Sequence, residues 1–194
     1  MHRRFLYLLL TGVLLSFGFF IVTPPPTQAA TLTVLNINDS GAGSLRETIA
    51  SAGSGDSIVF SASIPLGSTI TLSSQLVIDK TLTIDGSAVS GLTISGGGSV
   101  RVFDVTSGVL TLQNLAVSGG GAPPGEDGGC IRAGSAHLTN VAVSNCQAAR
   151  GGGMYISTLA TISSASFTTN NATAHGGAIY AENAALTILN NTLF

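Results

Sequence analysis

The sequence has little charge and no tryptophan. Charged residues occupy 8% of its 194 positions, against roughly a quarter in an ordinary soluble domain. The net charge is −2 and there is no basic cluster, so we do not expect nucleic acid as a partner. The two cysteines and three histidines do not fall at the spacing of a metal site. No metal ligand, cofactor site or catalytic residue is therefore predicted. Abundant glycine, serine, threonine and β-branched residues favour a β protein with tight turns.

The first thirty residues have the layout of a secretory signal peptide. Arg3 and Arg4 precede an uncharged apolar run at 5–22, three prolines follow, and 27–30 contains small residues suited to cleavage. We predict that residues 1–30 are removed, that the mature chain begins at Ala30 or Thr31, and that it is extracellular or lies at the cell surface. An uncleaved anchor helix is the alternative, because the run is long enough to span a bilayer.

A glycine pair recurs in the second half of the chain. The pairs are separated by intervals of 24 residues and comprise Gly128, Gly129, Gly152, Gly153, Gly176 and Gly177. Leu138, Ile162 and Leu186 share the same interval. A period of this size indicates a stacked repeat, in which each unit buries its apolar face against its neighbours. We predict an all-β parallel β-helix over 61–194 with about 24 residues per coil, in which Ile162 lies between Leu138 and Leu186.

Short apolar runs punctuated by glycine, serine, aspartate or asparagine fill residues 60–127. They are too short and too close together for wide hairpins, so we interpret them as one strand per side of a coiling ribbon. Leu112, Leu115 and Val117 match Leu138, Val141 and Val143 at an offset of 26 residues. The two additional residues lie in the polar loop 119–127, which is expected to project from a corner of the coil.

Residues 31–60 are expected to form an entry segment with one helix. Ser44 is a candidate N-cap, and Glu47 completes a capping box. Leu45, Ile49 and Ala52 give a narrow apolar stripe, and Gly53 follows the stripe. Such a helix could cover the exposed first edge of the strand stack, or it could simply lead into the first strand.

Two parts of the sequence resemble known families of exported bacterial proteins. The segment from Asp39 to Ile49, with the later strand 56–60, resembles the entry segment of β-helix proteins that carry a CSLREA-type domain, although Gly43 replaces the cysteine of that name. The sequences at 176–179 and at 167–170, which ends in Asn170, resemble the short repeats of the polymorphic outer membrane protein family of surface adhesins. These resemblances imply a right-handed parallel β-helix, displayed outside the cell, that contacts a glycan or another cell surface.

The chain stops at Phe194, within the unit that begins at Gly176. We therefore expect either a fragment of a longer repeat protein or an edge that pairs with a partner or with itself. In both cases an open edge of unpaired backbone groups predicts self-association of the isolated chain.

The acidic residues are the candidates for catalytic chemistry. Glycoside hydrolysis needs carboxylates roughly 5–10 Å apart, which in a β-helix means matching positions on neighbouring coils. Asp104, Asp127 and Glu182 have no acidic residue 24 positions away. Glu126 and Asp127 are interpreted as a solvated loop rather than a cation site, and Asp79 and Asp85 as turn residues. A non-enzymatic structural or adhesive module is therefore predicted; a polysaccharide lyase or glycoside hydrolase is the alternative.

Three further patterns leave alternatives open. Cys130 and Cys146 could form a disulfide, which export permits, or remain two buried thiols. Tyr155 and Tyr180, which are 25 residues apart, could belong to a sugar-binding face or to ordinary packing. The Thr-x-Thr pairs at 69–71 and 81–83 would suit an ice- or glycan-binding face, but their offset is half a period, so they are not expected to stack.

Overall fold

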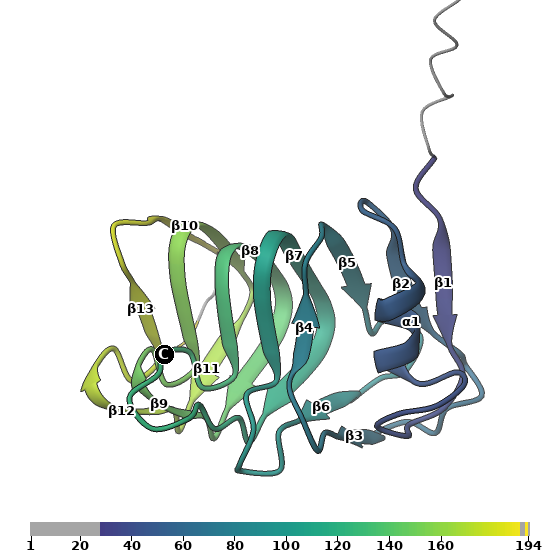
Figure 1. Cartoon of the computed structure of the whole chain (residues 1–194), viewed down its shortest axis with the longest axis horizontal. Helices are drawn as coiled ribbons and strands as arrows, with labels where there is room; N and C mark the ends of the chain where they lie inside the picture. Colours follow the sequence, from purple (N-terminus) through teal and green to yellow (C-terminus); the bar gives the residue numbers. More distant parts are fainter. Residues whose placement is uncertain (1–27, 191–192, 194) are drawn as a thin grey trace, which may run out of the picture.

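The computed structural model describes residues 28–190 and 193. Strands account for 51% of the structure and helix for 4%, and the chain forms a parallel β-solenoid of about 6 turns with roughly 26 residues per turn. Figure 1 shows the coils stacked side by side, with the N-terminal strands at one end and β13 at the other. The predicted fold class is confirmed, and the coil is slightly longer than the predicted 24 residues. The predicted signal peptide lies almost wholly outside the described residues.

Each coil passes through three parallel sheets in turn. The first sheet contains β1 (Thr31–Val34), β2 (Ser57–Phe60), β5 (Leu82–Asp85), 109–113 of β7 (Phe103–Ser118), 135–139 of β8 (Ile131–Ser144), 159–163 of β10 (Met154–Ser163) and β14 (Ala185–Leu189). The second sheet contains β3 (Thr69–Thr71), β6 (Thr93–Ser95), 116–118, 142–144 and β11 (Ser166–Thr168). The third contains β4 (Leu76–Ile78), 103–105, 131–133, 154–156 and β13 (Ile179–Ala181). A small separate sheet pairs β9 (Gln147–Arg150) with β12 (Asn171–His175).

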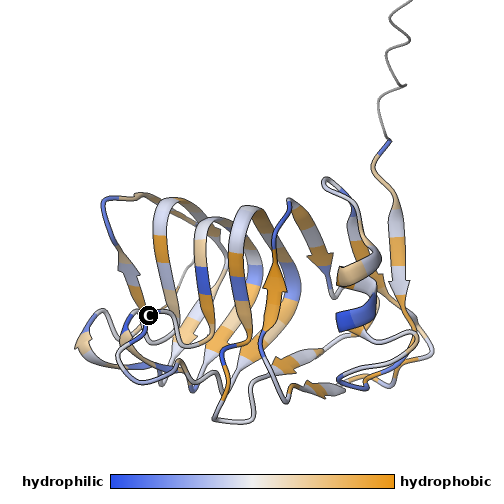
Figure 2. Ribbon diagram, in the orientation of Figure 1, coloured by the Kyte–Doolittle hydropathy of each residue, from blue (hydrophilic) through white to orange (hydrophobic). Residues whose placement is uncertain are grey.

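Alternation along each strand separates the core from the surface. In β4, Leu76 and Ile78 are buried, whereas Val77 between them is 52% exposed. The same inward positions recur in the neighbouring coils, so the apolar side chains form one continuous core along the axis. Figure 2 shows this alternation as orange and pale or blue segments along the strands. Burial of these side chains is the main force that holds one coil against the next.

The register confirms some of the predicted stacking and corrects the rest. Leu112 pairs with Leu138, and Leu138 pairs with Ile162, as predicted. Ile162, however, pairs with Ile188, and Leu186 pairs with Ala160. The interval of 24 residues fails here because the coil that leads to β14 is two residues longer than the coil before it.

The glycine repeat marks a sharp corner before the third sheet. Gly128, Gly151 and Gly176 have φ values of +72°, +61° and +64°, in the region that favours glycine. A Cβ atom at each position would come within 2.5 Å of the carbonyl oxygen three residues later. The equivalent pair in the middle coil is therefore 151–152. The prediction of Gly152 and Gly153 as that pair was one residue out, because three consecutive glycines conceal the register. Gly153 instead occupies the position of Cys130.

The predicted helix is α1 (Leu45–Ser51). The Ser44 hydroxyl accepts a hydrogen bond from the Glu47 N–H at 3.3 Å, which confirms the N-cap, whereas the Ser44 N–H donates to the Gly41 carbonyl rather than to Glu47. Leu45, Ile49 and Ala52 are buried as predicted. In its coil the helix takes the place of a third-sheet strand and lies beside β4 (Figure 1). It therefore covers the first edge of the third sheet, while the first sheet begins with β1.

Asp39 and Arg46 fasten this helix to the coil that follows. The Arg46 guanidinium donates to the carbonyls of Ser74 and Gln75 at 2.7 and 2.9 Å and forms an ion pair with Asp39 at 2.6 Å. Asp39 also accepts hydrogen bonds from the backbone and hydroxyl of Ser73. Burial tends to raise the pKa of Asp39, but the bonds from Ser73 and Arg46 outweigh it and leave that pKa below its ordinary value. Asp39 and Arg46 thus have a structural role at the start of the third sheet.

Cys130 and Cys146 form a disulfide that closes most of one coil. Both residues are buried. Since the bond closes a loop of 16 residues, its removal is expected to cost about 3 kcal/mol. The double variant Cys130→Ser/Cys146→Ser should therefore unfold at a lower denaturant concentration than the oxidised chain. Intact mass should show that the oxidised chain has two fewer hydrogen atoms than the reduced chain. Equal midpoints for the oxidised and reduced proteins would contradict this prediction.

Candidate functional site

The outer surface of the third sheet carries most of the ionisable side chains beyond the entry segment. Asp104, Arg132, Tyr155 and Tyr180 occupy one outward column, each in register with the next. Loops beside this column add further charges. We call the following seven residues the charge cluster: Arg101, Asp104, Glu126, Asp127, Arg132, Arg150 and Glu182.

Arg101 lies at the buried side of the charge cluster. Its side chain is 1% exposed. The guanidinium donates to the carbonyls of Asp127 and Gly128 at 2.9 and 2.8 Å, to the Gln75 side chain at 3.0 Å and to the Glu126 carboxylate at 2.8 Å. Glu126 and Asp127 belong to the loop 119–127, and Gly128 directly follows it. Arg101 therefore anchors that loop to the solenoid.

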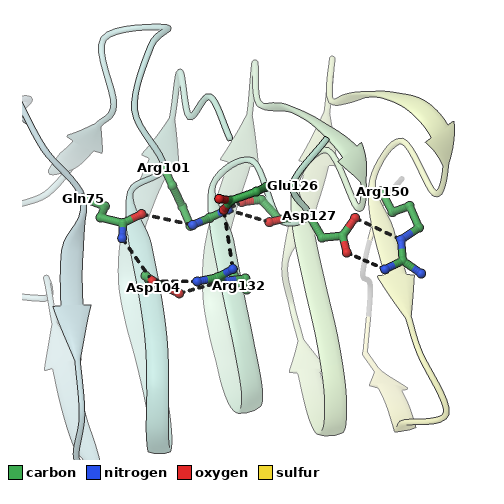
Figure 3. A network of polar contacts seen from close by, with 8 residues as sticks. Gln75, Arg101, Asp104, Glu126, Asp127, Arg132 and Arg150 are labelled. Carbon is green, nitrogen blue, oxygen red and sulfur yellow. Dashed lines mark hydrogen bonds and ion pairs between the residues drawn. The ribbon is translucent and has the colours of Figure 1, made fainter. Parts of the chain in front are cut away.

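A second arginine completes a closed ring of polar contacts. Arg132 donates to both oxygens of Asp104 at 2.7 and 2.9 Å, and it contacts Glu126 at 3.5 Å. Asp104 also accepts a hydrogen bond from Gln75 at 3.0 Å. Figure 3 shows Gln75, Arg101, Glu126, Arg132 and Asp104 connected in sequence around this ring. A bidentate arginine–carboxylate pair of this kind combines charge with fixed geometry.

The remaining contacts extend the network toward β13. Arg150 donates to both oxygens of Asp127 at 3.0 and 2.6 Å and to Glu182 at 2.8 Å. The Tyr155 hydroxyl donates to the other oxygen of Glu182. The prediction of a solvated loop at Glu126 and Asp127 holds for 123–126, which are exposed. Glu126 is half-exposed, but both carboxylates are ion-paired with arginines from neighbouring coils.

Tyr155 and Tyr180 form a stack along the axis rather than an open platform. Their ring centroids are 6.1 Å apart and their planes differ by 20°. The Arg150 guanidinium lies over both rings, 5.6 Å from the Tyr155 centroid and 4.8 Å from that of Tyr180, and His175 stacks on Tyr180 at 6.2 Å. Because the rings face one another and Arg150, the geometry favours packing over the stacking of a sugar on an exposed ring.

The contacts around Glu182 shift the pKa values of three groups. Hydrogen bonds from Tyr155 and Arg150 hold the pKa of Glu182 below its ordinary value of 4.5. The same bond, aided by partial burial, raises the pKa of Tyr155 to about 12. Bonds to Asp127, Glu182 and Tyr180 raise the pKa of Arg150 further above its usual range. Glu182 is thus held ionised, which is the opposite of what a general acid in glycoside hydrolysis requires.

The raised pKa of Tyr155 can be measured directly, because Tyr7 lies in the predicted signal peptide and the mature chain keeps two tyrosines. Ultraviolet titration of the folded protein should show one phenol with a pKa near 12. Tyr155→Phe should abolish this transition, and Glu182→Gln should move it toward 10.0. Since the folded-state pKa is raised, the stabilisation is complete below pH 10.0 and is lost as the pH rises toward 12. Titration of Tyr155 near pH 10 in the folded chain would contradict the assigned hydrogen bond.

The other predicted candidates have structural surroundings. Asp85 accepts hydrogen bonds from Ser87 and Asn114 and behaves as the predicted turn residue. The Asn170 side chain donates to the Val143 carbonyl and accepts from the Cys146 N–H, so it joins neighbouring coils. Among residues 28–190 and 193, no group of histidine, cysteine, aspartate or glutamate side chains could hold a metal ion.

The threonine pairs do not stack on one another, as predicted. Thr69 and Thr71 lie in β3 of the second sheet, whereas Thr83 lies in β5 of the first. The structure does reveal a different column of mostly hydroxyl-bearing residues on the first sheet. The sequence does not show this column at a fixed interval, because its residues are unequally spaced. This outward column consists of Thr31, Ser57, Thr83, Thr111, His137, Thr161 and Thr187.

Comparison with protein-family models, with curated proteins and with solved structures finds no match to this chain. Within the described part of the chain, α1 is far too short to cross a membrane, and no other helix meets the length and hydropathy that a span requires.

Proposed function

We propose that this chain is exported and acts as a non-catalytic, adhesin-like binding module outside the cell or at its surface. The proposal depends on one observation, which is that every carboxylate of the charge cluster is ion-paired. Each of its carboxylates, on Asp104, Glu126, Asp127 and Glu182, is ion-paired with an arginine. Such a network stabilises a projecting loop and leaves none of these four carboxylates free of an arginine to serve as an acid or a nucleophile.

The layout of residues 1–30 and the two family resemblances support export and display. A solenoid also presents long, regular outer surfaces that suit extended ligands. The ligand class that fits these surfaces is a glycan on another cell or in its surroundings.

The experiment combines localisation with binding. The full chain, expressed with its own first thirty residues, should appear outside the cytoplasm. Its mass should be that of a chain whose first residue is Ala30 or Thr31. The labelled mature protein should bind components of a glycan array without releasing reducing sugar from them. Turnover of a bound glycan that is lost in Glu182→Gln or Asp104→Asn would show an enzyme instead, and retention of Met1 in a cytoplasmic pool would refute export.

The mature chain should also self-associate through the edge formed by β13 and β14. Leu186 and Ile188 occupy inward positions of β14, yet they are 36% and 43% exposed. Both strands pair with β10 on one side, and apolar surface beside a strand edge favours pairing with another chain. Light scattering should show a mass that increases with concentration, and Leu186→Lys/Ile188→Lys should reduce the increase. A monomer at high micromolar concentration would argue against this contact.

A further inference from the structure

A groove of about 640 Å³ runs along the corner between the first and second sheets, away from the charge cluster. Residues of successive coils line it: Gly86, Ser87, Ser90, Gly91, Leu92, Asn114, Leu115, Ala116, Asn140, Val141, Ala142, Ser164, Ala165, Ser166 and Leu193. Its volume lies in the range of known ligand sites. Because equivalent positions recur at each coil, the same lining is repeated along the axis at intervals of about 4.8 Å.

The backbone fixes the shape of this corner. Asn114, Asn140 and Ser164 adopt positive φ values of 55°, 54° and 51°, a conformation that asparagine tolerates better than most residues. Each is followed by a buried residue and then by a small outward residue. The small outward residues, Ala116, Ala142 and Ser166, are in register with one another and leave the floor of the groove unfilled. The groove is therefore formed by the fold itself before any ligand binds.

The groove is polar but carries no charged side chain. Asn140 donates to Asn114 at 3.0 Å, and Asn114 donates to Asp85 at 2.9 Å. The side-chain amide oxygen of Asn140 and the hydroxyls of Ser164 and Ser166 make no hydrogen bond with any residue that the structure describes. Donors and acceptors are thus available along the groove, and two of its three floor residues are alanine.

These properties separate the possible classes of ligand. A nucleic acid would need cationic side chains, and the lining has none. A peptide that added a strand would need a free backbone edge, but the backbone here is already paired. The Gly86 N–H donates to the Gln113 carbonyl, and the Ala116 N–H donates to the Leu92 carbonyl. A neutral glycan matches the groove in charge, in its abundance of hydroxyl groups and in its linear repeat.

We propose that this groove binds an unbranched, neutral oligosaccharide laid along the solenoid axis. The inference rests on the proposed binding function and assigns it to a particular surface. The hydroxyl and amide groups of successive coils form hydrogen bonds with the sugar hydroxyls, while Ala116 and Ala142 contact the apolar edges of the rings.

Calorimetry of the mature chain with unbranched oligomers of glucose, mannose and N-acetylglucosamine tests the proposal. At least one should bind, and oligogalacturonate, which is anionic, should not. Asn140→Gly preserves the left-handed backbone but removes the amide, and Ala142→Phe fills the floor. Each should weaken binding about tenfold or more, which corresponds to roughly 1.4 kcal/mol. Asn145→Gly and Ser144→Phe are matched controls, because Asn145 has a φ of 56° and neither residue lines the groove.

The controls should bind as the unaltered protein does, and circular dichroism should confirm that every variant is folded. The assignment is overturned if no neutral oligomer binds, or if folded Asn140→Gly and Ala142→Phe both retain full affinity. Glycan binding that survives both variants would show that the groove is not the binding site, but it would leave the proposed binding function intact. Absence of binding to any glycan on the array would instead count against the proposed function itself.

Discussion

Replacing Ile162 with aspartate is expected to unfold most of the protein. Ile162 is fully buried and lies between Leu138 and Ile188 in the first sheet. Aspartate would place an unpaired carboxylate in the apolar core, which should cost at least about 4 kcal/mol. Thermal unfolding followed by circular dichroism measures the effect. Thr161→Asp is the matched control, because Thr161 points outward from the same strand, and its effect should remain within about 0.5 kcal/mol.

The identity of the neighbour can be tested separately. In double-mutant cycles, Ile162→Ala should couple to Ile188→Ala by about 0.5 kcal/mol or more, as residues in contact generally do. Its coupling to Leu186→Ala should be weaker, since Leu186 pairs with Ala160. The opposite order, or an Ile162→Asp variant with unchanged thermal stability, would show that the register of the last coil is wrong.

The pattern of apolar residues was sufficient to predict the solenoid but not every step of its register. Inward positions such as Leu112 and Leu138 are identified correctly because side-chain burial requires them to recur. The coils differ in length by small insertions in their loops, and burial does not constrain those residues. In the run Gly151–Gly153 the sequence also offers no side chain to distinguish one position from the next. The predicted interval therefore slipped by one residue at Gly152 and by two at Leu186.

The charge cluster was not predicted, for a related reason. Asp104 reaches Arg132 only because the loop 119–127 lengthens the intervening coil, and Arg150 meets Asp127 from a separate small sheet. At the fixed interval of 24 residues no acid matches another acid, whereas the structure pairs acids with arginines across coils of unequal length. Opposite charges at intervals between 23 and 28 residues are the signal that identifies Asp104 with Arg132 and Asp127 with Arg150.

Loss of the Arg101 guanidinium is the second large effect that we expect. Arg101→Met keeps much of the apolar stem but removes every hydrogen bond that the Arg101 guanidinium makes to the loop 119–127 and to Gly128. The carbonyls of Asp127 and Gly128 would lose their partner in a buried site. Removing one member of a buried polar network typically costs about 3–5 kcal/mol, and the midpoint of denaturant unfolding should fall accordingly. Arg101→Lys should recover only part of the loss, since one ammonium cannot reach acceptors arranged around a planar guanidinium.

Glu126→Gln separates the role of the carbonyl acceptors from that of the ion pair. Glu126 is 45% exposed, so neutralising it should cost no more than about 1 kcal/mol, with Arg101 still bound to the loop backbone. Limited proteolysis should then cut within 119–127 rapidly in Arg101→Met but slowly in Glu126→Gln, because only the former releases the loop. Equal stability and equal cleavage of Arg101→Met and Glu126→Gln would mean that Arg101 contributes only its charge. The position of the loop on the third sheet would then not depend on the hydrogen bonds of the buried guanidinium.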